Sequence, residues 1–217
     1  MLDLSKYIVH DLTHTLSDKI AGFSEKSACT MSVEGWNAKT LTIYSHAGTH
    51  MDAPFHFEVN EITIDQIRPD QLMGRAWVLD VPVTKPSQLI HLEDVEKQVV
   101  SVEIGDSLLF RTNWSSNYEQ ANYKTELPRL SKELSEWCVE KQIKMIGVEP
   151  LSVADVGNLA EVTEIHQLLL GGGITIIEGV AGLDKIIAPV VYLIALPLKI
   201  GHGDGAPARV IALEEKA

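Results

Sequence analysis

The 217-residue chain has few cysteines and an excess of acidic over basic residues. Cys29 and Cys138 stand far apart, so they form no C-x-x-C motif and provide no disulfide framework. Lys and Arg number 18 against 30 Asp and Glu, which gives a formal net charge of −12 at pH 7. Such a charge repels phosphate backbones and anionic membrane surfaces. We therefore expect neither nucleic acid nor a membrane as partner.

Long hydrophobic runs are also missing. The longest apolar stretch, residues 186–198, is interrupted by Pro189 and Pro197 and is shorter than the ~20 residues that a membrane helix needs. Residues 1–6 lack the basic start and apolar stretch of a signal peptide, so we expect an intracellular, cytoplasmic protein. There is no repeat or low-complexity tract. With 45% hydrophobic and 22% charged residues, the sequence predicts one globular domain over residues 1–217.

Strand-like segments outnumber helical ones. The predicted strands cover residues 41–45, 75–81, 107–111, 145–148, 174–177 and 190–196. One helix is expected to begin after Ser131, a favourable N-cap, and a second to span residues 162–170 before three glycines. Because the helices fall mostly in the second half, this order predicts a mixed α/β domain without regular β-α-β-α alternation.

The most informative segment is H-A-G-T-H-M-D-A-P-F-H, residues 46–56, which holds three of the eight histidines. Gly48, Thr49 and Pro54 all oppose a regular helix, so an extended or turning segment is expected. Imidazole together with carboxylate is a ligand set that Zn²⁺ or Mn²⁺ prefers. The segment therefore predicts a divalent metal site, and the alternative is a loop whose histidines only cap and pack.

The spacing within this segment suggests which side chains converge. In an extended chain His50 and Asp52, two residues apart, point to the same side. Gly48 can adopt the positive φ that turns His46 back toward them. We therefore predict that His46, His50 and Asp52 bind one ion, with His56 close by.

Two further residues are ambiguous from the sequence alone. Glu178 follows the apolar segment 174–177, where an unpaired buried carboxylate would be costly. It could equally reach solvent or pair with Lys185. His166 lies on the expected second helix beside Ile165, where a packed, hydrogen-bonded histidine is the usual expectation.

The motif at residues 46–56 resembles the signature of the cyclase-type metal-dependent hydrolases, the group that contains bacterial arylformamidases (kynurenine formamidases). Other segments that resemble this family are residues 11–14, 109–114, 165–169, 176–178, 197–200 and 204–209. The resemblance covers nearly the whole chain. It implies a swivelling β/β/α fold that usually assembles as a homodimer or homotetramer.

The resemblance also implies a complete metal site. Its ligands correspond to five side chains: His46, His50, Asp52, His166 and Glu178. Asp52 and Glu178 would bridge two ions, most simply Zn²⁺, although some relatives use a single Mn²⁺ on similar ligands. His56 would be the general acid/base, since imidazole exchanges protons near neutrality. From the residues alone, His56 could instead be structural or could orient a ligand.

The activity implied by the resemblance is hydrolysis of an amide or related carbonyl compound, with N-formyl-L-kynurenine the best-known substrate of the family. Many family members carry a substrate-stacking tryptophan in a Pro-Gly-rich loop. Here residues 20–25 occupy that place, and Phe23 is the candidate ring without the Pro-Gly context. Two alternatives stay open. One is a cyclic amide or lactone hydrolase of the isatin hydrolase type with one Mn²⁺, and the other is a metal-binding protein without turnover.

The remaining polar residues are assigned smaller roles. His14 is expected to line the pocket without binding metal, and His202 to lie in a glycine-rich loop. Asp204 and Arg209 are interpreted as structural loop residues.

Overall fold

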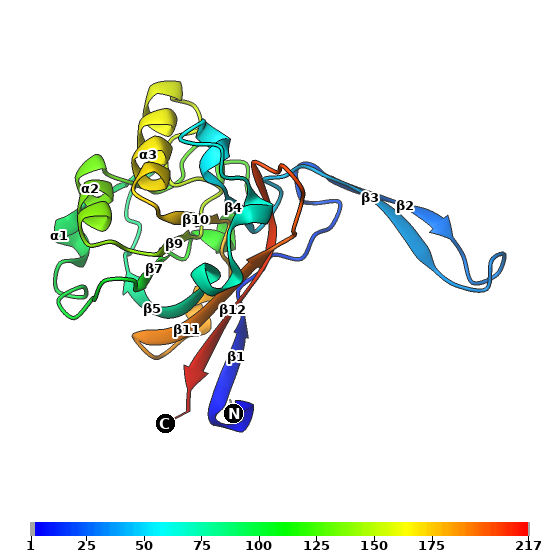
Figure 1. The fold of residues 1–217 in the computed structure, drawn as a ribbon, viewed down its shortest axis with the longest axis horizontal. Coiled ribbons are helices and arrows are strands. Elements are labelled where there is room, and N and C mark those ends of the chain that lie inside the picture. The colour runs from blue at the N-terminus through cyan, green and yellow to red at the C-terminus, as the bar shows by residue number, and fades with distance from the viewer. Residues whose placement is uncertain (1–2, 217) are drawn as a thin grey trace.

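The computed structural model describes residues 3–216, and strands dominate this part of the chain. The main sheet contains β1 (Tyr7–Asp11), β4 (His50–Asp52), β5 (Met73–Asp80), β7 (Ser107–Arg111), β9 (Met145–Val148), β10 (Thr175–Glu178), β11 (Val190–Pro197) and β12 (Gly205–Glu215). Their order is β1-β12-β11-β5-β7-β9-β10-β4, and β4 also pairs with β12. The sheet therefore closes into a barrel, with β1 added along the C-terminal half of β12 (Figure 1).

The helices cover one side of this barrel. They are α1 (Leu92–Val95), α2 (Lys132–Glu140) and α3 (Leu159–Gly171), and they lie beside β7, β9 and β10 (Figure 1). These three strands run parallel and are almost entirely buried, as expected for continuous apolar segments. Leu134 of α2 and Leu169 of α3 share a hydrophobic core with Phe110 and Ile146. No helix within residues 3–216 is both long and apolar enough to cross a membrane.

Most of the predicted elements are confirmed. The segments 75–81, 107–111, 145–148, 174–177 and 190–196 correspond to β5, β7, β9, β10 and β11. Ser131 caps α2 as predicted. The other helix, α3, begins before the predicted residue 162 because Asn158 accepts a hydrogen bond from Glu161 N. The strand-rich, mixed α/β architecture with few helices is thus the observed one.

Two pairs of strands lie outside the main sheet. β6 (Leu89–Ile90) pairs with β8 (Arg129–Leu130), and β2 (Phe23–Cys29) pairs with β3 (Ala38–Ile43). The predicted strand at residues 41–45 overlaps β3 and therefore leads into the histidine segment from outside the barrel.

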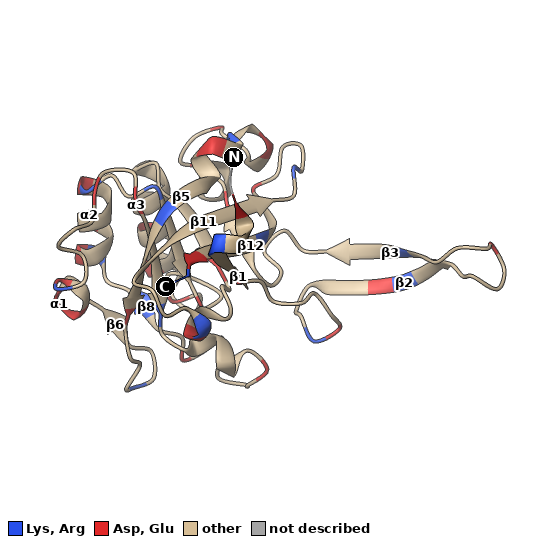
Figure 2. Ribbon diagram, turned by 90° about the horizontal axis from the view of Figure 1, so that it is seen from below, with Lys and Arg blue, Asp and Glu red and all other residues tan. Residues whose placement is uncertain are grey.

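The β2–β3 hairpin projects from the barrel as a separate arm, residues 23–43 (Figure 1, Figure 2). Its tip exposes 67% of Met31, 79% of Val33 and 59% of Trp36. Lys39 and Glu25 form an ion pair across its strands. A two-stranded hairpin is marginally stable by itself in water, so this arm is suited to contact another surface.

Candidate metal centre

Strand β4 carries the centre of the histidine segment into the barrel. It pairs antiparallel with both β10 and β12, so that His50 lies opposite Glu178 and Asp52 opposite Gly205. Gly48 has φ +65°, which gives the turn predicted before this strand. Residue 179 also has to be glycine, because a Cβ there would lie 2.5 Å from the Gly48 carbonyl oxygen. The chain thus passes closely over β10 before it enters β4.

Four buried side chains meet where β4, β10 and α3 come together. His50 Nε2 lies 3.2 Å from Glu178 Oε2 and 3.8 Å from Asp52 Oδ1. From α3, His166 Nε2 lies 3.3 Å from Glu178 Oε1 and 3.6 Å from Asp52 Oδ2. The structure therefore brings the two residues that were ambiguous from sequence, His166 and Glu178, into contact with the motif.

In each histidine ring of this group, the nitrogen directed away from the carboxylates (the outer nitrogen) makes a hydrogen bond. His50 Nδ1 donates to the Gly48 carbonyl at 3.0 Å, and His166 Nδ1 donates to the Val162 carbonyl at 2.7 Å. Because a carbonyl oxygen only accepts, the proton of each neutral ring is on Nδ1 and the lone pair of Nε2 faces the carboxylates. Histidines that bind metals in proteins are commonly fixed in this way.

One carboxylate oxygen of the group has no hydrogen-bond partner among the described residues. Asp52 is fully buried, and its Oδ2 has no hydrogen-bond partner within residues 3–216. Lone pairs of two rings and two carboxylates thus converge in a space that excludes water, where an uncompensated charge is costly. A divalent cation such as Zn²⁺ or Mn²⁺ resolves this, since it takes nitrogen and carboxylate oxygen together. The residues present fit such an ion.

The electrostatics of the cluster indicate the same need for positive charge. Burial alone would lower the pKa of His46, but hydrogen bonds to Asp52 and Asp204 and their charges raise it to about 9. Burial would raise the pKa of Glu178, but His166 and His50 lower it. Both shifts reflect the negative charge of the carboxylates beside the rings, which a bound cation would balance.

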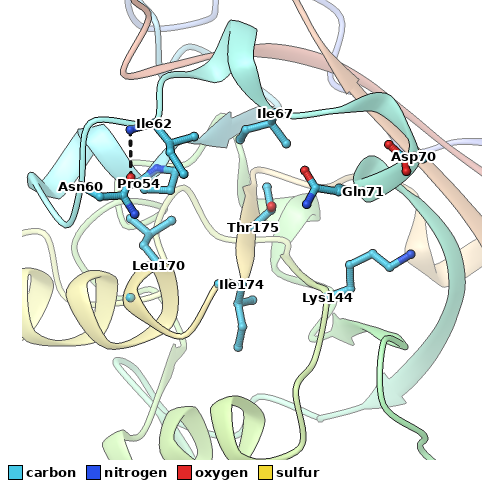
Figure 3. A pocket seen from close by; sticks show the side chains of 12 residues that line it. Pro54, Asn60, Ile62, Ile67, Asp70, Gln71, Lys144, Leu170, Ile174 and Thr175 are labelled. Carbon is cyan, nitrogen blue, oxygen red and sulfur yellow. Dashed lines mark hydrogen bonds between the residues drawn. The ribbon is translucent and has the colours of Figure 1, made fainter.

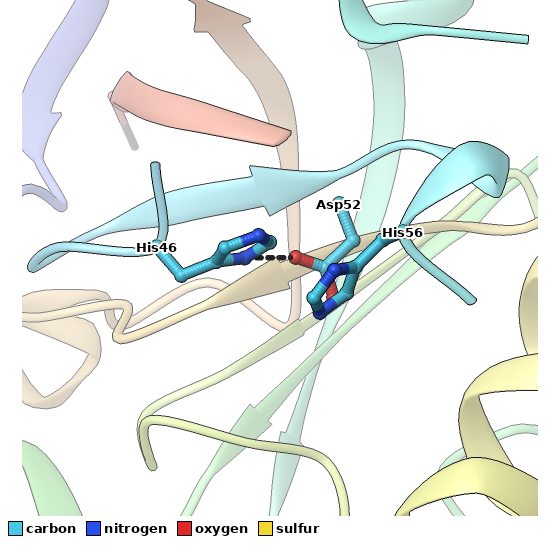
Figure 4. A group of neighbouring side chains, drawn as sticks. All are labelled: His46, Asp52 and His56. Atoms are coloured by element: carbon cyan, nitrogen blue, oxygen red, sulfur yellow. Dashed lines mark hydrogen bonds and ion pairs between the residues drawn. The ribbon is translucent and has the colours of Figure 1, made fainter. Parts of the chain in front are cut away.

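A second group of donor atoms shares Asp52 with the first. His46 Nδ1 is 2.9 Å from Asp52 Oδ1, and the His56 ring stacks on the His46 ring with centroids 4.0 Å apart (Figure 4). One donor atom from each of these residues lies within 4.8 Å of the others. His56 comes from the turn Pro54–Phe57 and has 25% of its side chain exposed, whereas His46 has 8%.

The cavity beside His46 offers room for a substrate. It measures about 360 Å³, and its walls include Tyr44, Tyr118, Tyr123, Leu151, Lys19 and Lys124. Phe23 begins β2 and pairs with Ile43, and it is not among the residues that line this cavity. Its role in substrate binding therefore stays a prediction.

A larger cavity of about 420 Å³ lies elsewhere, where β9 and β10 begin (Figure 3). Ile62, Ile67 and Leu170 contribute apolar walls, and Lys144 Nζ already donates to the Met73 carbonyl at 2.9 Å. None of the predicted site residues lines it. Of these two cavities, the one beside His46 is the one that adjoins the cluster.

A carboxylate that the sequence analysis did not assign to the site contacts it, and another that the sequence analysis did not single out is buried in the barrel. Asp204, interpreted as a structural loop residue, accepts a hydrogen bond from His46 Nε2 at 2.8 Å. Glu149 is fully buried at the end of β9 and accepts hydrogen bonds from Thr112 N and Trp114 N, both at 2.9 Å. The only sequence signal for Glu149 was its position directly after a buried strand. Arg209, which was interpreted as a structural loop residue, pairs with an aspartate away from the cluster.

His14 lies beside the cavity wall without reaching the cluster. Its ring packs against Tyr118 in a tilted arrangement, with centroids 4.2 Å apart, and its backbone N–H donates to Thr49 Oγ1. Burial lowers the pKa of His14. The residue thus contacts a wall of the cavity beside His46 but is not among the residues that line it, so its place in the pocket stays a prediction.

Comparison with known proteins places this chain among related sequences and structures. Residues 10–155 match the family described as "Putative cyclase". Kynurenine formamidase of Bacillus cytotoxicus is 31% identical over 208 residues, which cover 93% of this chain and 95% of that protein. Kynurenine formamidase of Bacillus mycoides is 33% identical over 180 residues, which cover 81% and 79%.

Among solved structures, isatin hydrolase A from Ralstonia solanacearum matches with a TM-score of 0.89 and 24% identity, covering 97% of this chain and 93% of that one. An isatin hydrolase bound to the product analogue thioisatinate matches with a TM-score of 0.90 and 21% identity, covering 98% and 94%. At these identities the likeness concerns the fold. The strand-rich α/β fold implied by the resemblance is confirmed.

Proposed function

Since this chain belongs to the cyclase family, we propose that it is a metal-dependent hydrolase acting on the C–N bond of an amide or a related carbonyl compound. The observation that carries this proposal is the buried donor cluster around Asp52, whose Oδ2 lacks a partner within the described residues. The cluster adjoins a cavity with room for a small molecule. A metal site that only stabilised the fold would not need a cavity beside it.

We assign the metal to the five predicted ligands: His46, His50, Asp52, His166 and Glu178. Two ions are favoured because Asp52 belongs to both groups of donor atoms, one with His46 and one with His50 and Glu178. Zn²⁺ is the first choice and Mn²⁺ the alternative, since both accept this mixture of nitrogen and oxygen. Ions bound there would polarise the substrate carbonyl and activate a water for attack.

We assign proton transfer to His56. Its ring is the most exposed of the histidine rings around Asp52, and it stacks on His46 at the edge of the cluster. Burial lowers the pKa of His56, although Asp52 acts in the opposite sense, so the ring is neutral near pH 7. A neutral imidazole can accept a proton from the attacking water and then give it to the departing amine.

For the substrate we propose an aryl formamide such as N-formyl-L-kynurenine. Relatives 31% and 33% identical to this chain are kynurenine formamidases, and tyrosines line the cavity beside His46. Aromatic walls suit an aryl ring, because aromatic pairs gain free energy beyond simple burial. The cytoplasmic location expected from the sequence stays a prediction.

The test is a substrate screen with purified, metal-loaded protein. N-Formyl-L-kynurenine, formanilide, isatin and an aromatic lactone are compared by kcat/KM, before and after chelation and after adding back Zn²⁺ or Mn²⁺. We expect the formamides to be hydrolysed fastest and only with metal. Preference for isatin or the lactone would replace the substrate assignment, and metal-loaded protein inactive on all four would favour a binding protein without turnover.

We also propose that two copies of the chain associate through the arm, residues 23–43. The arm exposes Met31, Val33 and Trp36 at its tip, and pairing of two copies would bury both sets of side chains together. Sedimentation should show a dimer that becomes monomeric when Val33 and Trp36 are both replaced by serine. A monomeric wild type at micromolar concentration would contradict this proposal.

A further inference from the structure

One exposed turn places a carboxylate at the edge of the metal centre. Asp204 precedes β12, and its carbonyl oxygen accepts a hydrogen bond from Ala53 N at 2.9 Å. Its Oδ2 accepts the Nε2–H of His46 at 2.8 Å and the Ser45 hydroxyl at 3.3 Å. The same oxygen lies 3.6 Å from Nδ1 of His56. A single carboxylate thus faces the two stacked rings.

The turn that carries Asp204 is packed too tightly to move away. A Cβ at residue 205 would lie 2.6 Å from the Met51 carbonyl oxygen and 2.7 Å from Cε1 of His46. A Cβ at residue 203 would lie 2.9 Å from Cγ2 of Ile64. Glycine on both sides of Asp204 is therefore needed for this close approach, which holds its carboxylate against the His46 ring.

His46 differs from the other rings in what holds it. The outer nitrogens of His50 and His166 donate to backbone carbonyls of their own segments. The outer nitrogen of His46 donates instead to Asp204, 158 residues away in the sequence. A carboxylate is a stronger acceptor than a carbonyl, and it raises the basicity of the opposite ring nitrogen.

We propose that Asp204 is a positioning residue that fixes His46 with Nε2 protonated and Nδ1 directed at the ion beside Asp52. Through the same Oδ2 it also keeps the His56 ring stacked against His46. Asp204 then acts on metal binding through His46, without itself being a ligand. This inference rests on the metal site proposed above.

The test compares Asp204→Ala and Asp204→Asn with a matched control, Asp65→Ala. Asp65 Oδ1 accepts the His202 N–H at 3.1 Å, so the control loosens the same turn without touching a ring of the cluster. Zn²⁺ affinity is measured by chelator competition, and the Nε2–H of His46 is followed by ¹⁵N-resolved NMR of the Zn²⁺-loaded protein. Neither measurement depends on activity.

We expect Asp204→Ala to bind Zn²⁺ about 10–100-fold more weakly and to lose the slowly exchanging His46 Nε2–H signal. Asp204→Asn, whose amide oxygen can still accept this hydrogen, should recover much of both. Asp65→Ala should resemble the wild type. If Asp204→Ala does not fold, a several-fold loss of affinity in Asp204→Asn with a faster-exchanging His46 signal is the expected result.

Three outcomes would overturn the inference. Wild-type affinity in Asp204→Ala would show that the contact does not act on the metal. An equal loss in Asp65→Ala would assign the effect to packing of the turn. Complete loss of one ion in both Asp204 variants would make Asp204 a ligand itself. If the wild type binds no divalent ion, the proposed function fails. The contact between Asp204 and His46 can still be tested in the metal-free protein, where the His46 Nε2–H should exchange slowly in the wild type but not in Asp204→Ala.

Discussion

Replacing Asp52 by asparagine tests the centre of the site with the least change in shape. Asp52 is fully buried, and its carboxylate faces His46 Nδ1 at 2.9 Å, His50 Nε2 at 3.8 Å and His166 Nε2 at 3.6 Å. Asparagine has the same size, but its NH₂ group places hydrogens where a cation requires lone pairs. Because Asp52 belongs to both groups of donor atoms, the change should remove all tightly bound metal.

The size of the effect follows from linkage between binding and folding. An ion that binds the folded chain alone adds about 2.7 kcal/mol to the free energy of unfolding when its free concentration is 100 times its Kd. For a chain of this length each 1 kcal/mol raises Tm by roughly 2–4 °C. The wild type should therefore gain about 5–11 °C per tightly bound ion. Asp52→Asn should gain almost nothing.

The assay is calorimetry in a Zn²⁺ buffer of fixed free concentration, with metal content measured on the same samples. Asp106→Asn is the matched control, because Asp106 is also buried but binds Arg75 and Trp77 away from the cluster. The control should unfold at a lower temperature yet keep the full gain on adding Zn²⁺. A full gain in Asp52→Asn would refute the reasoning.

The remaining predictions concern His56 and two buried glutamates. His56→Ala should keep its metal and lose roughly 10²–10⁴-fold in kcat/KM on an anilide, with a smaller loss on an activated ester, and equal losses would contradict proton transfer by His56. Burial would raise the pKa of Glu214, but hydrogen bonds from Ala188 N, His10 and Ile187 N lower it. Its stabilising contribution is therefore present above the unfolded pKa of about 4.3 and lost as pH falls through the folded value. In urea unfolding, Glu214→Gln should be less stable than wild type by about 1–3 kcal/mol at pH 7, with a smaller difference near pH 3. Glu149→Ala leaves the buried N–H of Thr112 unpaired and that of Trp114 with only its longer contact to Thr112 Oγ1 at 3.3 Å, and it should lose about 3 kcal/mol, whereas Glu149→Gln, which keeps an acceptor, should lose much less.

The short-range features of this protein follow from the sequence by itself. Apolar segments such as 107–111 and 145–148 predict buried strands because each residue must be covered on both faces. Part of the arrangement around Asp52 also follows from local sequence. Alternation along a strand directs His50 and Asp52 to one side, and Gly48 permits the turn toward His46. A resemblance to a known family was needed for His166, because a histidine on an apolar helix face has the same pattern whether it packs or binds an ion.

The tertiary structure alone decided how distant residues meet around Asp52. Strand β4 has three residues, and nothing in them specifies that it pairs with β10 on one edge and β12 on the other. That pairing places Glu178 opposite His50 and brings Asp204, interpreted from the sequence as a loop residue, to His46. The register of such long-range pairs is set by packing of the whole barrel, which no local pattern encodes. For the same reason, the projection of the arm away from the barrel could not be foreseen from its alternating residues.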